Sequence, residues 1–223
     1  MKKNTKIAGC IFLVLGILDL LCIITSHEEW RFFTKPLLMP SLAAAALLQL
    51  LPEHKGKSTW LLLAGLCFHT LGDTLLLLDS KGFVFFAAGL GAFLVGHFFY
   101  LAILLSGIGG LRNWKEFLCL LVPLVMAPIL VGLFGVEWPF SAVVSVYALT
   151  LMIVAARGVL WKLRDKAFAS RVIWGGIIFI ISDSLIAVNA FAGLDFPFRA
   201  PLVMISYLIA EVLLVSAMVC SSK

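Results

Sequence analysis

Residues Leu61 to Leu78 read LLLAGLCFHTLGDTLLLL, and this stretch indicates how the whole chain is built. The run is long enough to cross a bilayer, yet it carries a carboxylate, Asp73, near its middle. An ionised carboxylate in hydrocarbon costs several kcal/mol unless it is protonated, paired or hydrated. The stretch therefore predicts a membrane helix whose Asp73 faces the interior of a helix bundle.

A second apolar run, Trp174 to Phe191 (WGGIIFIISDSLIAVNAF), carries the same pattern around Asp183. Asp183 follows Asp73 by 110 residues, and His97 and Tyr207 each follow their acid by 24 residues. This spacing suggests two parallel four-helix repeats, residues 1–112 and 113–223, related by an axis along the membrane normal. Chance similarity in so apolar a composition is the alternative.

Composition places the chain among polytopic membrane proteins. Of its 223 residues 62% are hydrophobic and 13% charged, with a mean hydropathy of +1.11, whereas soluble domains are about 45–50% apolar and about 25% charged. The net charge of +5 is spread between apolar segments, which excludes a nucleic-acid-binding patch. The five cysteines lie in or at the ends of apolar runs without CxxC spacing, so neither a disulfide framework nor a zinc site is expected.

The apolar runs predict an all-α protein of eight transmembrane helices in a single domain, residues 1–223, because no loop is long enough to be a domain. We place a polar turn through Lys35 before the second helix, which Pro36 would open, and a basic loop at Arg157–Arg171. The expected spans are residues 6–25, 36–52, 59–79, 83–105, 114–134, 138–160, 171–193 and 198–220.

Lysine and arginine counts predict the orientation in the membrane. Of the 17 basic residues, 13 fall on the side of the N-terminus and 4 on the other, so both termini are expected to be cytoplasmic. Short loops and a lysine-rich start favour a bacterial inner (cytoplasmic) membrane.

Several polar side chains are expected at one depth in the bundle. At 1.5 Å of rise per residue they lie within a few ångströms of their helix midpoints, as groups converging on one cavity would. His97 and Tyr100 share one face of their helix, and so do Tyr207 and Glu211. The side chains at this depth are those of Asp73, Asp183, His97, Tyr207 and Glu211.

Other intramembrane polar residues are expected to be structural. We interpret His69, Tyr147 and Asn189 as hydrogen-bonding within the bundle, and Asp19 as an ion-pair partner of Lys35 or a water-facing group. His69, Asp73 and His97 could form a three-ligand metal site, but the pattern is weak and we predict neither metal nor cofactor. No acyl-transfer or nucleotide motif is present in the sequence.

Five short motifs occur in order along the chain: Thr34-Lys35-Pro36, Leu71-Gly72-Asp73, Gly96-His97-Phe98-Phe99-Tyr100, Ile181-Ser182-Asp183-Ser184 with Asn189, and Ser206-Tyr207. In these motifs the chain resembles the YhhN family of membrane proteins, which includes the lysoplasmalogenases. The resemblance implies hydrolysis of the vinyl ether bond of a lysoplasmalogen to a fatty aldehyde and a glycerophospho-base. It also implies that the functional positions are Lys35, Asp73, His97, Tyr100, Asp183 and Tyr207. At Glu211 the chain departs from the pattern, because many relatives have an amide near that position.

Vinyl ether hydrolysis needs a proton donor and a second group that stabilises an oxocarbenium ion or activates water. Two carboxyl groups can fill these two roles. We predict that Asp73 and Asp183 are this catalytic pair. Lys35 would contact the lipid phosphate or only snorkel to the interface. The other substrate-binding or orienting residues would be His97, Tyr100, Asn189, Tyr207 and Glu211. The alternative is a small-molecule or proton-coupled transporter that uses the same acids.

The expected partners are a lysophospholipid substrate and membrane lipids. The sequence indicates neither a nucleic acid nor an obligate protein partner.

Overall fold

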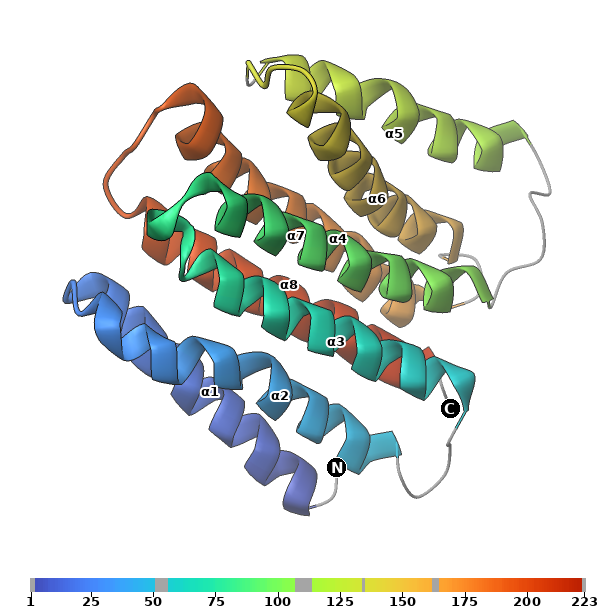
Figure 1. The fold of residues 1–223 in the computed structure, drawn as a ribbon. Coiled ribbons are helices and arrows are strands. Elements are labelled where there is room, and N and C mark those ends of the chain that lie inside the picture. The colour runs from blue at the N-terminus through green and yellow to red at the C-terminus, as the bar shows by residue number, and fades with distance from the viewer. Residues whose placement is uncertain (1–2, 51–55, 107–113, 134, 162–164, 222–223) are drawn as a thin grey trace. The chain divides into compact units, whose positions relative to one another are not determined.

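The structure is a computed structural model that describes residues 3–50, 56–106, 114–133, 135–161 and 165–221. Within these ranges all regular structure is helical, with eight α-helices and two short 3-10 helices (Figure 1). The α-helices are α1 (Lys3–Ile24), α2 (Arg31–Leu50), α3 (Lys57–Leu76), α4 (Phe83–Ser106), α5 (Trp114–Leu133), α6 (Phe140–Trp161), α7 (Lys166–Ala192) and α8 (Arg199–Ser221). The 3-10 helices are η1 (Glu28–Trp30) and η2 (Asp79–Lys81).

Seven of the described helices are long and apolar enough to cross a membrane, and Leu121–Leu133 of α5 is a shorter apolar helix. Many large apolar side chains on these helices are exposed, as lipid-facing surfaces require. The prediction of an all-α polytopic membrane protein is confirmed. The cytoplasmic placement of the termini stays a prediction.

Helix α2 begins earlier than predicted. Instead of a polar turn ending at Pro36, η1 leads directly into α2 at Arg31, and both Pro36 and Pro40 lie inside the helix. Proline within a membrane helix is tolerated where neighbouring groups satisfy the freed backbone atoms. The earlier start of α2 places Thr34 and Lys35 on a helix from which their side chains reach α1 and α3.

The basic segment Arg157–Arg171 is largely helical, which corrects the predicted loop. Helix α6 continues to Trp161, and α7 begins at Lys166, while residues 162–164 lie outside the described ranges. Asp165 explains the early start of α7, because its carboxylate accepts hydrogen bonds from the backbone N–H groups of Ala167 (2.9 Å) and Phe168 (3.0 Å). The other end of α7 is closed by Gly193 in the left-handed conformation, φ 63°.

The chain divides into two compact units. Unit 1 comprises Met1–Ile103 together with Met218–Lys223, and unit 2 comprises Leu104–Ala217. Unit 1 therefore carries Asp73, and unit 2 carries Asp183. The suggested repeats, residues 1–112 and 113–223, stay a prediction.

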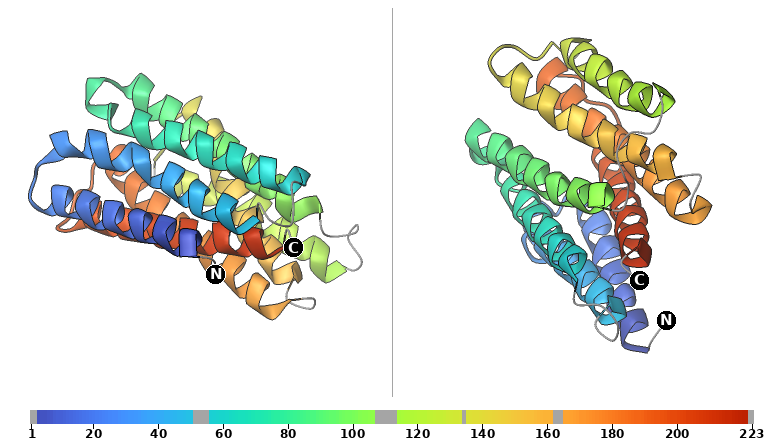
Figure 2. Two further views of the ribbon diagram at one scale, coloured as in Figure 1. Left: turned by 90° about the horizontal axis from the view of Figure 1, so that it is seen from below. Right: turned by 90° about the vertical axis from the view of Figure 1, so that its right-hand side faces the viewer.

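In unit 1, α1 packs along α2 and α2 along α3, and α3 and α4 run antiparallel side by side (Figures 1 and 2). Large side chains of each of the helices α3 and α4 pack against glycines of the other helix. In every such pair the two residue numbers add up to the same value, as expected for two antiparallel helices in one register. A Cβ built at Gly96 would lie 2.1 Å from His69 Cδ2, so only glycine fits there. The pairs are Gly65 with Tyr100, His69 with Gly96, Gly72 with Phe93, and Leu76 with Gly89.

In unit 2, α6 packs against both α5 and α7. Glycines again set the spacing, because a Cβ at Gly176 would lie 2.8 Å from Ala155 Cβ and a Cβ at Gly158 would lie 2.8 Å from the backbone nitrogen of Ile173. These two contacts share one antiparallel register. Helices α6 and α7 are therefore held in a single alignment at close distance.

Candidate functional site

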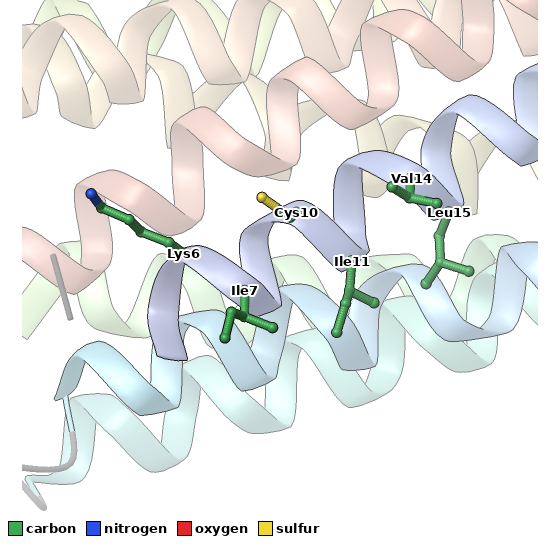
Figure 3. A pocket seen from close by; sticks show the side chains of 6 residues that line it. All are labelled: Lys6, Ile7, Cys10, Ile11, Val14 and Leu15. Carbon is green, nitrogen blue, oxygen red and sulfur yellow. The ribbon is translucent and has the colours of Figure 1, made fainter. Parts of the chain in front are cut away.

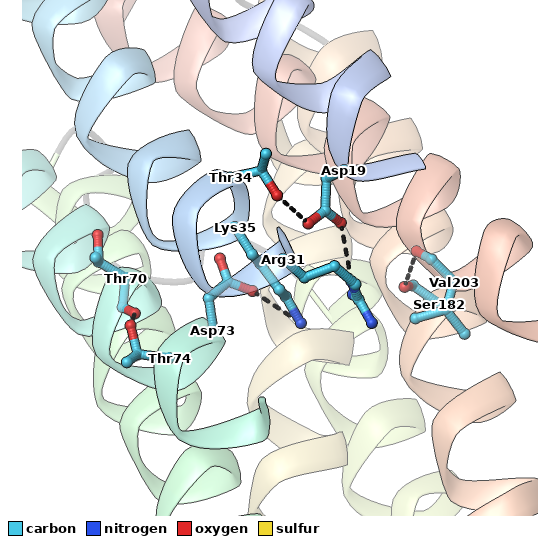
Figure 4. Close-up of polar contacts among 9 residues, drawn as sticks. All are labelled: Asp19, Arg31, Thr34, Lys35, Thr70, Asp73, Thr74, Ser182 and Val203. Carbon is cyan, nitrogen blue, oxygen red and sulfur yellow. Dashed lines mark hydrogen bonds and ion pairs between the residues drawn. The ribbon is translucent and has the colours of Figure 1, made fainter. Parts of the chain in front are cut away.

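In unit 1, α2 and α3 bring a lysine and an aspartate together. Lys35 Nζ lies 3.6 Å from Asp73 Oδ1, and both side chains are largely buried, with 13% and 2% of their surfaces exposed (Figure 4). The neighbouring hydroxyl of Thr74 donates to the carbonyl of Thr70 in its own helix (2.8 Å). The lysine thus provides the opposite charge that a carboxylate within an apolar helix needs.

A second buried carboxylate, Asp19 of α1, also pairs with α2. It accepts a hydrogen bond from Thr34 Oγ1 (2.7 Å), and its Oδ2 lies 3.4 Å from Arg31 Nε (Figure 4). The sequence suggested Lys35 as the partner of Asp19, and this is corrected. Arg31 and Lys35 lie one turn apart on α2. Arg31 pairs with Asp19, and Lys35 pairs with Asp73.

Three predicted polar side chains form an aromatic cluster between α3 and α4. The His69 ring lies 4.7 Å from that of His97 and 4.9 Å from that of Tyr100, measured between centroids. His97 Nδ1 lies 2.8 Å from the backbone oxygen of Phe93, and since a carbonyl only accepts, Nδ1 is the donor. This bond orients the His97 ring, which a residue that directs water or an ether oxygen requires.

His69 and His97, two of the three residues considered as metal ligands, lie together between α3 and α4, whereas Asp73 pairs with Lys35. In the described ranges, no three His, Cys, Asp or Glu side chains are grouped so that they could hold a metal ion. His69 instead lies among aromatic rings and over Gly96.

In unit 2, α6 and α7 hold the second predicted catalytic acid. The hydroxyl of Tyr147 donates a hydrogen bond of 2.5 Å to Asp183 Oδ2, and the Tyr147 side chain is buried. The sequence assigned Tyr147 only a structural role within the bundle. The contact between Tyr147 and Asp183 was not predicted, because it depends on how α6 is aligned with α7. Glycine contacts between the two helices set this alignment, and no pattern within a single helix encodes such contacts.

Helix α8 carries two further predicted residues of unit 2, Tyr207 and Glu211. Ser182 Oγ donates to the carbonyl of Val203 (3.0 Å), and the Tyr207 ring meets Phe179 edge-on at 5.6 Å. Glu211 is fully buried, and it interacts electrostatically with Tyr147.

Asn189 lies further along α7 and is half-buried. Its backbone oxygen accepts from Gly193 N–H (3.2 Å), which closes the helix end. The structure thus joins Lys35 to Asp73, and His97 to Tyr100, within unit 1. In unit 2 it joins Asp183 to Tyr147, a residue that was not predicted to belong to the site.

A shallow hollow of about 460 Å³ lies along α1 and is lined mostly by apolar side chains (Figure 3). Lys6 stands at one end, and the hollow follows one side of the helix through successive turns to Leu15. None of the predicted site residues lines it.

Comparison with known proteins agrees with the resemblance found in the sequence. The model of the YhhN family matches residues 30–218. Curated proteins named "Uncharacterized membrane protein YhhN" from Escherichia coli O6:H1, Escherichia coli O157:H7 and Shigella flexneri are each 32% identical over 127 residues, which is 56% of this chain and 58% of theirs. The chain thus matches little more than half the length of these relatives.

No solved structure matches the chain. The family match covers most of the sequence, including every residue predicted for the site. The chain therefore belongs to the YhhN family of membrane proteins.

Proposed function

We propose that this protein hydrolyses the vinyl ether bond of lysoplasmalogens, releasing a fatty aldehyde and a glycerophospho-base. The proposal draws on the family, which includes lysoplasmalogenases, and on the seven described helices that are long and apolar enough to cross a membrane. A single-chain lipid can reach polar groups at membrane depth from the bilayer itself. This access suits an enzyme whose acids lie within apolar helices.

One observation carries the proposed chemistry: the two intramembrane aspartates have different partners. Asp73 lies beside the ammonium of Lys35, whereas Asp183 accepts a hydrogen bond from the phenol of Tyr147. Paired acids that share a reaction need environments that separate their roles. A cation beside Asp73 suits a carboxylate that stays charged, and a neutral donor on Asp183 suits a carboxyl group that exchanges a proton.

The reaction then runs in three steps. The carboxyl group of Asp183 transfers its proton to the vinyl carbon that is not bonded to oxygen, which leaves an oxocarbenium ion and an Asp183 carboxylate. The Asp73 carboxylate stabilises this cation electrostatically. Water adds to the cationic carbon and returns a proton to Asp183, and the resulting hemiacetal breaks into the aldehyde and the glycerol hydroxyl. That both acids serve one substrate stays a prediction from the sequence.

The orienting roles follow the same scheme. His97, held by its bond to the Phe93 carbonyl, and Tyr100 would direct water or the ether oxygen. Lys35 would contact the lipid phosphate as well as Asp73, and Tyr207, Glu211 and Asn189 would line the substrate path. These roles are part of the proposal.

The test is turnover by purified protein, with released aldehyde measured by mass spectrometry. Lysoplasmalogen should be cleaved, and the matched lysolipid with a saturated alkyl ether should not, because it has no double bond to protonate. Asp73→Asn and Asp183→Asn should each lower kcat about 100-fold or more, the usual contribution of general acid–base catalysis. Asp79→Asn, in the exposed turn η2, is the matched control and should leave kcat unchanged.

Two results would contradict the proposal. One is a folded wild-type protein that releases no aldehyde, and the other is an Asp73 or Asp183 variant with near-normal turnover. Movement of a lipid or solute across vesicles without product formation would favour the transporter alternative.

A further inference from the structure

We infer that Tyr147 is a positioning residue that holds the carboxyl group of Asp183 in its working orientation. The inference rests on the proposed function and deepens it, because it assigns a role to a residue on a different helix from either acid. Its starting point is the 2.5 Å hydrogen bond from the Tyr147 hydroxyl to Asp183 Oδ2. A donor this close, on a buried side chain, fixes one oxygen of the carboxyl group.

The bond depends on the alignment of α6 and α7, which the glycine contacts set. Gly176 lies against Ala155, and Gly158 lies against Ile173, at distances that leave no room for a Cβ. Tyr147 and Asp183 lie about two turns beyond these contacts and follow the same antiparallel register to within one residue. A slip of one residue would move a side chain by about 1.5 Å along the helix and about 100° around it, and it would separate the two groups.

A second face of α7, about 100° around the helix, is fixed as well. Ser182, next to Asp183, donates to the Val203 carbonyl of α8 at 3.0 Å, and Phe179, one turn earlier, packs edge-on against Tyr207. A Cβ at Gly175 would lie 2.8 Å from Leu214 Cγ. Helix α7 is thus held by α6 on one face and by α8 on a neighbouring face, so the carboxyl group has little freedom apart from its own torsions.

The consequence for the reaction concerns which oxygen carries the proton. Because Oδ2 accepts the phenol, the proton that Asp183 gives to the vinyl carbon is carried on Oδ1. Without the phenol the carboxyl group can rotate about its terminal torsion, which is broad for aspartate. Proton transfer then becomes slower while substrate binding is little changed.

Infrared spectroscopy tests the positioning without reference to turnover. The carboxyl bands of Asp183 are identified as those lost in Asp183→Asn. Tyr147→Phe should shift these bands, because it removes the hydroxyl and keeps the ring. Thr150→Val is the matched control, since Thr150 lies on the same helix, is buried, and donates only to the Val146 carbonyl one turn away in its own helix (2.8 Å).

Kinetics tests the consequence. Tyr147→Phe should lower kcat about 10- to 100-fold, the range expected for one hydrogen bond to an ionisable group, with KM changed less than about 2-fold. Gly176→Ala should reproduce both the band shift and the loss of kcat by displacing α6 from α7. Gly132→Ala, where a Cβ meets nothing within 4 Å, should do neither.

The outcomes separate this inference from the proposed function. If the infrared carboxyl bands of Asp183 do not shift in Tyr147→Phe, the positioning role is overturned, whatever rate of turnover that variant shows. A band that moves while kcat stays at the wild-type value also overturns it. If the band moves but the wild-type protein releases no aldehyde, the proposed function fails, while the hold of Tyr147 on Asp183 stands.

Discussion

Lys35 of α2 and Asp73 of α3 form an ion pair of 3.6 Å between two helices of membrane length. The pair gives a buried carboxylate its countercharge, and it joins the first candidate acid to the one lysine that the family resemblance singles out. Its effects on stability can be measured separately from catalysis.

Replacing Lys35 with Met should destabilise the protein because it removes the countercharge of Asp73. We expect a loss of about 1–3 kcal/mol in the free energy of unfolding, below the full cost of breaking a deeply buried pair because Lys35 is partly exposed. Combining Lys35→Met with Asp73→Asn should cost less than the sum of the single changes. Denaturant unfolding in detergent measures this cycle, with exposed Lys81→Met as control. Strictly additive effects would contradict the pairing.

Gly96→Ala should destabilise the α3–α4 interface, whereas Gly91→Ala should not. A Cβ at Gly96 would lie 2.1 Å from the His69 ring, while a Cβ at Gly91 meets nothing within 4 Å. Overpacking costs about 1–3 kcal/mol, and alanine in an open helix position gains up to about 1 kcal/mol over glycine. Thermal unfolding of the two variants compares them directly, and equal melting temperatures would be inconsistent with the close packing.

Thr34→Val should weaken unit 1 by removing the hydrogen bond to Asp19. A bond to a charged, buried acceptor contributes about 1.5–3 kcal/mol, and the Thr34 hydroxyl lies 2.7 Å from Asp19 Oδ1. Thr25→Val is the matched control, because the exposed Thr25 hydroxyl donates to the Leu21 carbonyl of its own helix. Chemical denaturation should show a clear loss for Thr34→Val and a change within about 0.5 kcal/mol for Thr25→Val.

Asp195, in the turn between α7 and α8, should titrate below its ordinary range. The hydrogen bond from Arg199 Nε (2.7 Å) lowers the pKa of Asp195 by favouring the carboxylate. A pKa that folding lowers adds stability above the unfolded pKa, and this contribution is lost as pH falls through the folded pKa. Carbon NMR of labelled aspartate should show the pKa of Asp195 rising in Arg199→Gln. An unchanged titration would contradict the role of Arg199.

Much of the fold was predictable, because a membrane helix can be recognised from the hydrophobicity of its own residues. Runs of about 20 apolar residues must be helical in hydrocarbon, so the helices were expected near their observed positions. The starts of α2 and α7 differ from the prediction, because Pro36 lies inside the helix that it was expected to open and Asp165 caps a helix that was expected to begin at residue 171. A proline inside a helix and a capping aspartate both depend on neighbouring groups.

The candidate site was predictable only in part. Asp73 and Asp183 stand out in the sequence because a carboxylate within an apolar run costs free energy whichever way it points. This cost can be recognised from the sequence of a single helix. Their partners were not visible in this way. The sequence predicts Lys35 only as a phosphate contact, a snorkelling lysine or the partner of Asp19, and it predicts a structural role for Tyr147.

A helical membrane protein of the YhhN family with two intramembrane acids can be recognised from the amino-acid sequence, because hydrophobicity and short motifs are local properties. The pairing of Lys35 with Asp73 and of Tyr147 with Asp183 is visible only in the packed helices. These pairings depend on the register between neighbouring helices. The glycine contacts between α6 and α7 fix which side chains face each other, and such contacts arise only when two helices pack.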